Sequence, residues 1–338
     1  MRALLGSLVV LAVLAGGGWA AYRGALEPVS GSGRAQLFEV APGAGVAAIA
    51  RRLERRRLIR SAAAFRLYLR LRGLDRDVKA GLYALSPSLG VAGVAAVLVE
   101  GRDMGRRLTV PEGWTAARVA QLVEDVVPGA GATFAALVAN PEAQRAEFAW
   151  LPPLPPGASL EGFLFPDTYV VTPGPGAAES LVRLMLARFE QVALPALRAE
   201  GPPLGAYQRL VMASIVEKEA VHPDERPTIA GVFYNRLALR MPFGSDPTVE
   251  YALGRHQGAQ GLTFKDVAVD SPYNTYKRAG LPPGPIANPG LASIRAAVRP
   301  ARTDLLYFVA RGDGTHVFTK TYRDHLDAQA RIVAGRSR

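Results

Sequence analysis

The first stretch of the chain differs from the rest in its hydrophobic pattern. Residues 3–22 carry no charge, and a helix of that length is about long enough to cross a ~30 Å hydrocarbon core. Arg2 and the N-terminal amine precede this run and Arg23 follows it, which is a weak positive bias toward an N-terminus in the cytoplasm. We therefore predict a transmembrane anchor at residues 1–23, with everything after it exported. A cleaved signal peptide is the main alternative, because residues 3–15 lead into a run of glycines.

Short periodic segments follow the anchor. Residues 24–35 mix Gly, Ser and Pro without periodicity, which is typical of a linker. Over residues 36–105 the hydrophobic pattern predicts a strand, two helices, a second strand and a third helix. These elements are expected at 37–40, 46–59, 61–72, 79–85 and 90–100. The segment is long enough for a small α/β domain.

Longer helices characterise residues 106–338. In the helix expected at 177–200, Leu181, Met185 and Phe189 repeat every four residues and mark its buried face. The remaining elements are a strand at 107–110, helices at 115–126, 207–220 and 228–239, and hairpin strands at 305–310 and 315–319. We therefore expect an α+β protein in which this part forms the larger domain.

Composition excludes several kinds of chemistry. The 338 residues include no cysteine, which excludes disulfide scaffolds, thiolate nucleophiles and cysteine-ligated metal sites. The four histidines form no H-x-x-x-H pair, and the chain has no G-x-S-x-G, G-x-G-x-x-G or P-loop sequence. Zinc hydrolases, α/β-hydrolases, kinases and dinucleotide enzymes are therefore disfavoured. We expect neither a metal nor a cofactor.

The net charge of +11 indicates an anionic partner. The densest basic run lies at residues 51–60 and lacks the interleaved aromatic residues that stack on nucleic-acid bases. Export also separates this run from the genome, so we expect no nucleic-acid partner. A solvated helix surface, anionic lipid headgroups and an anionic extracytoplasmic polymer remain as explanations.

The helix expected at residues 207–220 has the most informative pattern. Its apolar residues leave almost no polar face, and its last turn carries Glu217, Lys218 and Glu219. Glu219 follows Ile215 by four residues and continues the apolar stripe, whereas Glu217 cannot share that face. Desolvation and the negative end of the helix dipole both raise the pKa of Glu219 and favour the protonated form that a general acid needs. The alternative is a glutamate at a fraying helix end, paired with Lys218 or an arginine.

Three later segments, at 243–249, 271–276 and 280–290, combine Pro and Gly with amide, hydroxyl and aromatic side chains. This composition suits a sugar-binding cleft, in which rings stack on tyrosine and amides bind hydroxyl and acetamido groups. The same composition is common in ordinary loops, so it predicts a binding site only together with other motifs.

Seven segments resemble the endolytic murein transglycosylases, and they occur in the family's order. They are VPEGW at 110–114, EGFLFPDTY at 161–169, ASIVEKE at 213–219, SDPTV at 245–249, YNTY at 273–276, GLPPG at 280–284 and YFVA at 307–310. The resemblance extends from the predicted anchor to the final hairpin. It implies a single-pass anchor in the inner (plasma) membrane, a small LysM-like domain over residues 36–105 and an extracytoplasmic catalytic domain over residues 106–338.

The resemblance also implies a site and a mechanism. In that family the second glutamate of the helix motif, here Glu219, is the catalytic acid and base. It protonates the oxygen between N-acetylmuramic acid (MurNAc) and N-acetylglucosamine (GlcNAc), then takes a proton from the muramyl 6-hydroxyl, which leaves a 1,6-anhydro end. Lytic transglycosylases in general carry a hydroxyl residue after this glutamate, but here Ala220 follows it. On motif matching and loop composition we expect the substrate to be placed by Asp246, Tyr273, Asn274, Tyr276 and Asn288.

The sequence therefore predicts a membrane-anchored carbon–oxygen lyase that cuts nascent peptidoglycan strands internally. Such an enzyme is expected to terminate strand elongation near the peptidoglycan synthases. Two alternatives stay open: a non-catalytic peptidoglycan-binding scaffold for those synthases, and a lysozyme-like hydrolase. The hydrolase needs a second carboxylate, which Asp246 or Glu250 could supply.

Overall fold

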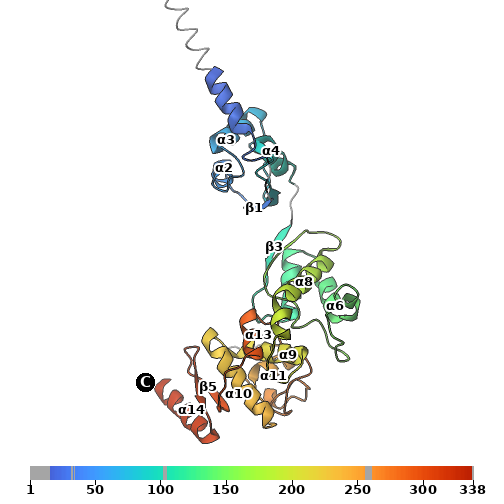
Figure 1. Cartoon of the computed structure of the whole chain (residues 1–338), viewed down its shortest axis with the longest axis vertical. Helices are drawn as coiled ribbons and strands as arrows, with labels where there is room; N and C mark the ends of the chain where they lie inside the picture. Colours follow the sequence, from blue (N-terminus) through green and yellow to red (C-terminus); the bar gives the residue numbers. More distant parts are fainter. Residues whose placement is uncertain (1–15, 32, 34, 102–104, 256–260, 337–338) are drawn as a thin grey trace, which may run out of the picture. The chain divides into compact units, whose positions relative to one another are not determined.

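The computed structural model describes residues 16–31, 33, 35–101, 105–255 and 261–336. These residues form a mixed α+β protein that is mostly helical, with three two-stranded sheets in the described ranges (Figure 1). The chain divides into two compact units. The N-terminal unit comprises the described residues up to Arg107 together with Val170–Pro173, and the C-terminal unit comprises Leu108–Tyr169 and the residues from Gly174 onward.

The predicted anchor lies mostly outside the described residues. Residues 1–15 are not described, and residues 16–26 are helical. Within the described part of the chain, no helix has the length and apolar character needed to cross a membrane. The membrane span at residues 3–22 therefore stays a prediction.

The N-terminal unit has the predicted order of elements. It contains β1 (Gln36–Val40), α2 (Val46–Arg55), α3 (Ala62–Arg72), β2 (Gly81–Leu85) and α4 (Gly90–Glu100). The two strands pair antiparallel with Phe38 opposite Tyr83, and both rings are fully buried. Leu53 of α2 and Phe65 of α3 belong to the same core.

Helix α2 is shorter than the pattern predicted. It ends at Arg55, although apolar spacing had suggested a helix to residue 59. Arg57 has a φ of 54°, a left-handed conformation that a right-handed helix cannot contain. The turn brings Leu58 and Ile59 into the core, which explains why their spacing resembled a continuing helix.

The remaining elements belong to the C-terminal unit, except that β3 and β4 each have residues in both units (Figure 1). They are β3 (Arg106–Thr109), α5 (Ala116–Val126), α6 (Gly131–Ala139), α7 (Glu142–Arg145), β4 (Thr168–Val171), α8 (Ala177–Arg198), α9 (Ala206–Glu219), η1 (Pro223–Glu225), α10 (Arg226–Ala238), α11 (Asp246–Leu253), α12 (Phe264–Val267), α13 (Leu291–Val298), β5 (Tyr307–Ala310), β6 (His316–Thr319) and α14 (Tyr322–Arg336). Strand β3 pairs with β4, and β5 pairs antiparallel with β6.

Helix α9 lies at the centre of this unit. It contacts α8, α10, α11 and α13, and every residue from Leu210 to Val216 is buried. A helix surrounded on all sides has a fixed position, because its side chains are packed against several neighbours at once. Its C-terminal turn, which carries Glu217 and Glu219, is therefore held by the core.

One segment that sequence composition assigned to a loop, 243–249, contains the start of a helix. Asp246 begins α11 with Pro247 next to it, and Ser245 precedes the helix as its N-cap residue. Proline and an acidic residue are both favoured in a first helical turn. Helix α13 follows the Pro- and Gly-rich segment 280–290 and packs against α9.

Candidate active site

Glu219 is the last residue of α9, and its carboxyl group is bound by a hydroxyl from a distant part of the chain. Ser245 Oγ donates a hydrogen bond of 2.5 Å to Glu219 Oε1. Ser245 itself is 1% exposed, so its hydroxyl lies inside the protein. The residue that follows Glu219 is Ala220, which has no hydroxyl, and Ser245 provides one from the start of α11.

Two buried threonines fix the position of Ser245. Its backbone N–H donates to Thr275 Oγ1 at 3.1 Å, and its carbonyl accepts from Thr248 Oγ1 at 2.7 Å. The two threonine hydroxyls are 2.8 Å apart and hydrogen-bonded to each other. This network links the SDPTV and YNTY segments. Thr248 and Thr275 were not singled out from the sequence, although both stand inside the motifs that were.

The surroundings of Glu219 favour its protonated form. The pKa of Glu219 is raised to about 7, chiefly by burial and also by the nearby carboxylates of Asp246 and Glu250. The hydrogen bond from Ser245 and the charge of Arg236 act in the opposite direction. A carboxyl group with this pKa holds a proton near neutral pH and can still release it, as a general acid requires.

Glu217 has a different environment, although only one residue separates it from Glu219. Its side chain is 6% exposed and lies 3.5 Å from the guanidinium of Arg226, measured from Oε1 to Nη2. Its other oxygen accepts the backbone N–H of Gly290 at 3.0 Å. Glu217 is therefore a paired carboxylate that joins α9 to the starts of α10 and α13.

A second buried glutamate, Glu161, lies in the same unit and was not predicted as a site residue. Burial raises its pKa to about 7. Both of its oxygens accept the backbone N–H of Ala116, at 3.0 and 2.9 Å, and Tyr251 and Asn288 donate further hydrogen bonds. Ala116 is the first residue of α5, where the helix dipole also favours a negative charge. The donors around Glu161 favour its carboxylate form and occupy its oxygens.

Asn288 lies at the centre of this second network and is completely buried. Its Oδ1 accepts the N–H groups of Gly162 and Leu164, at 2.9 and 3.0 Å. Its Nδ2 donates to the Trp114 carbonyl and to Glu161, each at 2.9 Å. The side chain thus joins the VPEGW and EGFLFPDTY motifs and contacts protein on every polar atom.

The other predicted substrate residues divide into exposed and buried groups. Asp246 and Tyr276 lie near Glu219, and the Tyr276 hydroxyl donates to Asp246 Oδ1 at 2.5 Å. Tyr276 is 39% exposed, so part of its ring faces solvent. Asn274 is fully buried, and its amide donates to the carbonyls of Val267 and Val269, both at 2.8 Å.

Tyr273 is half-buried and its ring packs beside that of Tyr251. Its ring centroid lies 4.9 Å from that of Tyr251. A Cβ atom at Gly284 would lie 2.9 Å from the Tyr273 hydroxyl and 3.1 Å from the Tyr207 hydroxyl. Glycine in the GLPPG segment therefore allows the backbone to approach these two tyrosines.

A cleft of about 590 Å³ adjoins the end of α9. Lys218 lines it, and so does Glu250, which is close enough to Glu219 to raise its pKa. Its walls carry aromatic, acidic and basic groups, with the Arg118 guanidinium 4.0 Å above the Trp114 ring. The lining comprises Gly113, Trp114, Thr115, Ala117, Arg118, Glu161, Lys218, Pro247, Glu250, Tyr251, Gly254, Arg255 and Ile286.

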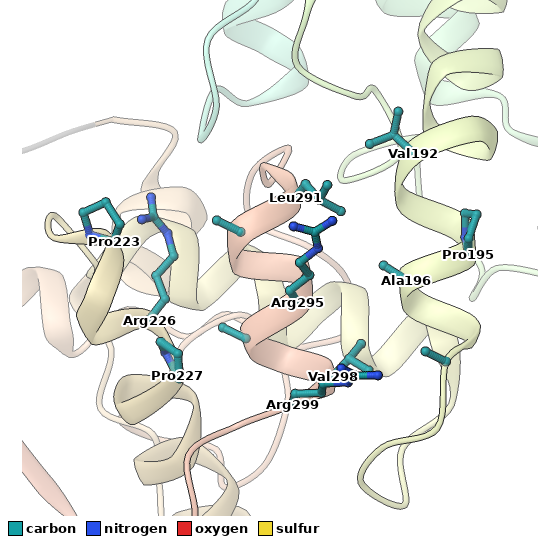
Figure 2. Close-up of a pocket in the computed structure, with 13 residues that line it drawn as sticks. Val192, Pro195, Ala196, Pro223, Arg226, Pro227, Leu291, Arg295, Val298 and Arg299 are labelled. Carbon is teal, nitrogen blue, oxygen red and sulfur yellow. The ribbon is translucent and has the colours of Figure 1, made fainter.

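A second pocket, also of about 590 Å³, lies over α13, and Glu219 is among the lining residues of neither pocket. Figure 2 shows its labelled residues on α8, on η1 and the start of α10, and on α13 and the residue that follows it. Most of them are apolar, and Arg226, Arg295 and Arg299 supply its charges. We assign the site to the first cleft, because it is lined by Lys218, which precedes Glu219 in the chain, by Glu250, whose charge acts on Glu219, and by the half-buried rings of Trp114 and Tyr251.

The histidines give no sign of metal or catalytic chemistry in the described residues, where no cluster of metal-ligating side chains occurs. His316 Nδ1 lies 2.7 Å from Glu225 Oε2, and its backbone N–H donates to the same carboxylate at 3.0 Å. This pairing anchors β6 to the turn before α10. His256 lies outside the described residues.

The chain matches the YceG-like family over residues 38–331 and belongs to that family. A crystal structure of a yceG-like protein from Listeria monocytogenes has the same fold, with a TM-score of 0.57 and 33% sequence identity. That similarity covers 88% of this chain and all of the Listeria chain.

Curated relatives carry a functional name. A Bacillus subtilis protein that is 32% identical over 342 residues is named endolytic murein transglycosylase, and the match covers 96% of this chain and 92% of that protein. A protein from Streptococcus pneumoniae with the same name is 32% identical over 348 residues. That match covers 94% of this chain but 63% of the longer streptococcal protein.

Proposed function

We propose that this protein is an endolytic murein transglycosylase that cleaves the β-1,4 bond between MurNAc and GlcNAc within peptidoglycan strands. The observation that carries the proposal is the environment of Glu219, a carboxyl group with a pKa of about 7, bound by Ser245 beside an open cleft. The similarity to the named Bacillus and Streptococcus proteins over nearly the whole chain supports the same activity.

In the proposed mechanism Glu219 acts first as a general acid. It protonates the glycosidic oxygen as the C1–O bond of MurNAc breaks, and an oxocarbenium-like centre develops at C1. The carboxylate then accepts the proton of the muramyl 6-hydroxyl, whose oxygen bonds to C1. The products are a 1,6-anhydro-MurNAc end and a free GlcNAc 4-hydroxyl, and Glu219 regains its proton. Water is not consumed.

Ser245 supports both steps because its hydrogen bond is made to Oε1 and fixes the direction of the carboxyl group. The second oxygen then remains available for the proton transfers. We propose that Ser245 takes the place of the hydroxyl residue that Ala220 lacks. Thr248 and Thr275 act through Ser245 as positioning residues.

Glu219 is a better candidate for the acid than Glu161, although burial raises both pKa values to about 7. The carboxyl group of Glu161 accepts bonds from Ala116, Asn288 and Tyr251, which favour its ionised form and occupy its two oxygens. A group so held has no free oxygen from which to protonate a substrate. We propose that Glu161 holds the cleft wall in place.

We propose that the glycan strand occupies the cleft, with sugar rings against exposed aromatic side chains. Asp246 and Tyr276 lie close enough to Glu219 to contact the sugars at the cleaved bond, and Tyr273 extends the surface. Asn274 and Asn288 would support this surface from behind, since both amides are buried against backbone groups. Lys218 and Arg118 supply positive charge for the carboxylates of peptidoglycan.

We further propose that residues 3–22 anchor the protein in the plasma membrane and that the two units lie outside the cytoplasm. Peptidoglycan is an extracytoplasmic substrate, so the catalytic unit has to be exported. The N-terminal unit, with its strand, helix, helix, strand order, is proposed to be LysM-like. Cutting nascent strands near the synthases would end their elongation.

Mass spectrometry of digested glycan strands tests the proposal and separates its alternatives. Purified protein and peptidoglycan should give new 1,6-anhydro-MurNAc ends. A lysozyme-like hydrolase would instead give reducing MurNAc ends, with Asp246 or Glu250 as the second carboxylate. This alternative has one supporting observation, since both carboxylates lie near Glu219. A scaffold protein would yield no new ends.

A further inference from the structure

Helix α3 of the N-terminal unit has an exposed face that is both basic and apolar. Arg66 and Arg70 are exposed one turn apart, and Leu67 and Leu71 form a parallel row beside them. The two leucines are 44% and 65% exposed. The opposite face of the helix, with Phe65 and Leu69, is completely buried in the core. The exposed leucines are therefore not needed for the packing of this helix.

The charge of the chain is concentrated around this face. Residues 46–76 contain ten arginines and two acidic residues, which gives this segment a net charge of +8 out of +11 for the whole chain. No carboxylate of the described residues lies within 4 Å of these arginines in an ion pair. Two of them instead bind backbone carbonyls, Arg56 that of Leu37 and Arg60 that of Pro28. The positive charge is left for a partner.

The end of the N-terminal helix is fixed to the same unit. Residues 16–26 are helical, and Leu26 packs against the core of the unit. The Arg60 guanidinium binds the Pro28 carbonyl at 2.8 Å, and Val29 N–H binds the Pro87 carbonyl at 3.0 Å. Leu26 lies four residues beyond the proposed span, which is about 6 Å along a helix. An embedded span would hold this unit within about one Debye length of the lipid surface.

We propose that the exposed face of α3, formed by Arg66, Leu67, Arg70 and Leu71, docks on the surface of an anionic phospholipid membrane. Arginine binds phosphate headgroups, and its long stem lets the neighbouring leucines enter the interface. A polysaccharide offers no apolar layer for exposed leucines, so lipid fits this face better than the wall polymer does. Docking through α3 would leave the other faces of the N-terminal unit available to contact the glycan. The proposal rests on the membrane anchor suggested above, but not on the catalytic mechanism.

The absence of cysteine allows a direct test with the full chain. Leu71→Cys is labelled with an environment-sensitive fluorophore, and the protein is reconstituted in vesicles of phosphatidylcholine alone or with added phosphatidylglycerol. Ala96→Cys, an exposed position on α4, which carries no arginine, is the control. We expect a blue shift and quenching by brominated lipid at position 71 in the anionic vesicles only. Arg66→Gln with Arg70→Gln should abolish the shift.

Equal signals from positions 71 and 96 in anionic vesicles would overturn the proposal. So would a shift at position 71 that needs added glycan strands and not anionic lipid, because the partner would then be the wall polymer. Anhydro-end formation is measured on the same samples. Anhydro ends without lipid contact would refute the docking alone, whereas lipid contact without anhydro ends would refute the proposed activity alone.

Discussion

Ser245 Oγ lies 2.5 Å from Glu219 Oε1, although the two residues are 26 positions apart in the chain. The contact joins the C-terminal end of α9 to the N-cap of α11. Hydrogen bonding to an ionised carboxylate lowers its pKa, while burial raises it. The pKa of about 7 for Glu219 is the balance of these opposing effects together with the neighbouring charges.

Replacing Ser245 by alanine should change both the rate and its pH dependence. A hydrogen bond to a charged group contributes about 1.5–3 kcal/mol, so we expect kcat to fall about 10- to 100-fold. The general acid is active when protonated, and activity should therefore fall as pH rises through about 7 in the unmodified protein. Loss of the Ser245 donor raises the pKa of Glu219, so this fall should move to higher pH.

Rate–pH profiles of the Ser245→Ala and Ser245→Thr variants test this role. Threonine keeps a hydroxyl and should retain the position of the pH profile, even if its extra methyl group lowers stability in this buried place. An unchanged rate and profile in Ser245→Ala would contradict a positioning role.

Removing the buried acid should stabilise the fold at high pH. The folded-state pKa of Glu219 is raised from 4.5 to about 7, so the native state holds its proton longer than the unfolded state. The protein therefore loses stability as pH rises from about 4.5 to about 7. Glu219→Gln avoids that loss and should be more stable by about 1–3 kcal/mol above pH 7, with little difference near pH 4.5.

Urea unfolding at pH 4.5 and pH 8 measures this effect. Glu190→Gln is the matched control, because Glu190 is exposed and should give the same stability as the unmodified protein at both values. A Glu219→Gln variant that is less stable than the unmodified protein at pH 8 would mean that the ionised carboxylate stabilises the fold.

Tyr276 should contribute its ring to substrate binding and its hydroxyl to the placement of Asp246. We expect Tyr276→Ala to raise KM about 10-fold, because the variant loses an aromatic surface against which a sugar ring can pack. Tyr276→Phe keeps the ring and should have the smaller effect on KM. Steady-state cleavage of soluble glycan strands measures both, and equal KM values for all three proteins would exclude the contact.

Asn288 should act on folding and not on substrate. Asn288→Ala leaves the buried N–H groups of Gly162 and Leu164 without an acceptor and removes one donor from Glu161. Each unsatisfied buried group costs about 1–3 kcal/mol, so the free energy of unfolding should fall by about 3 kcal/mol or more. Thermal unfolding measures this loss. A variant of normal stability with a raised KM would instead make Asn288 a substrate ligand.

The sequence correctly predicted those helices and strands whose apolar residues follow the regular spacing of the element from end to end. Helix α4 was expected at residues 90–100 and is found there, ending before Gly101 in the left-handed conformation. The raised pKa of Glu219 was also expected, because the apolar stripe of α9 continues to that position. Local spacing was sufficient for α4. For Glu219 it predicted only the direction of the pKa shift, because the charged and hydrogen-bonding groups that act on this carboxyl lie outside α9.

The sequence did not predict features that depend on contacts between distant segments. The Ser245 donor and the Asn288 network join residues 26 and up to 174 positions apart, which no local period can reveal. Asp246 was expected in a loop, but it begins α11, a helix of eight residues that is too short for a clear period. Glu161 lies in the EGFLFPDTY motif, but its burial depends on contact with α5, which comes from another part of the chain.

The products of Glu219→Gln test the central claim most directly. The unmodified protein, Glu219→Gln and the control Glu190→Gln are each incubated with purified peptidoglycan, and the strand ends are identified by mass spectrometry. We predict 1,6-anhydro-MurNAc ends from the first and the last, and none from a folded Glu219→Gln variant. Anhydro ends formed at an undiminished rate by Glu219→Gln would contradict the assignment of Glu219 as the acid and base of this enzyme.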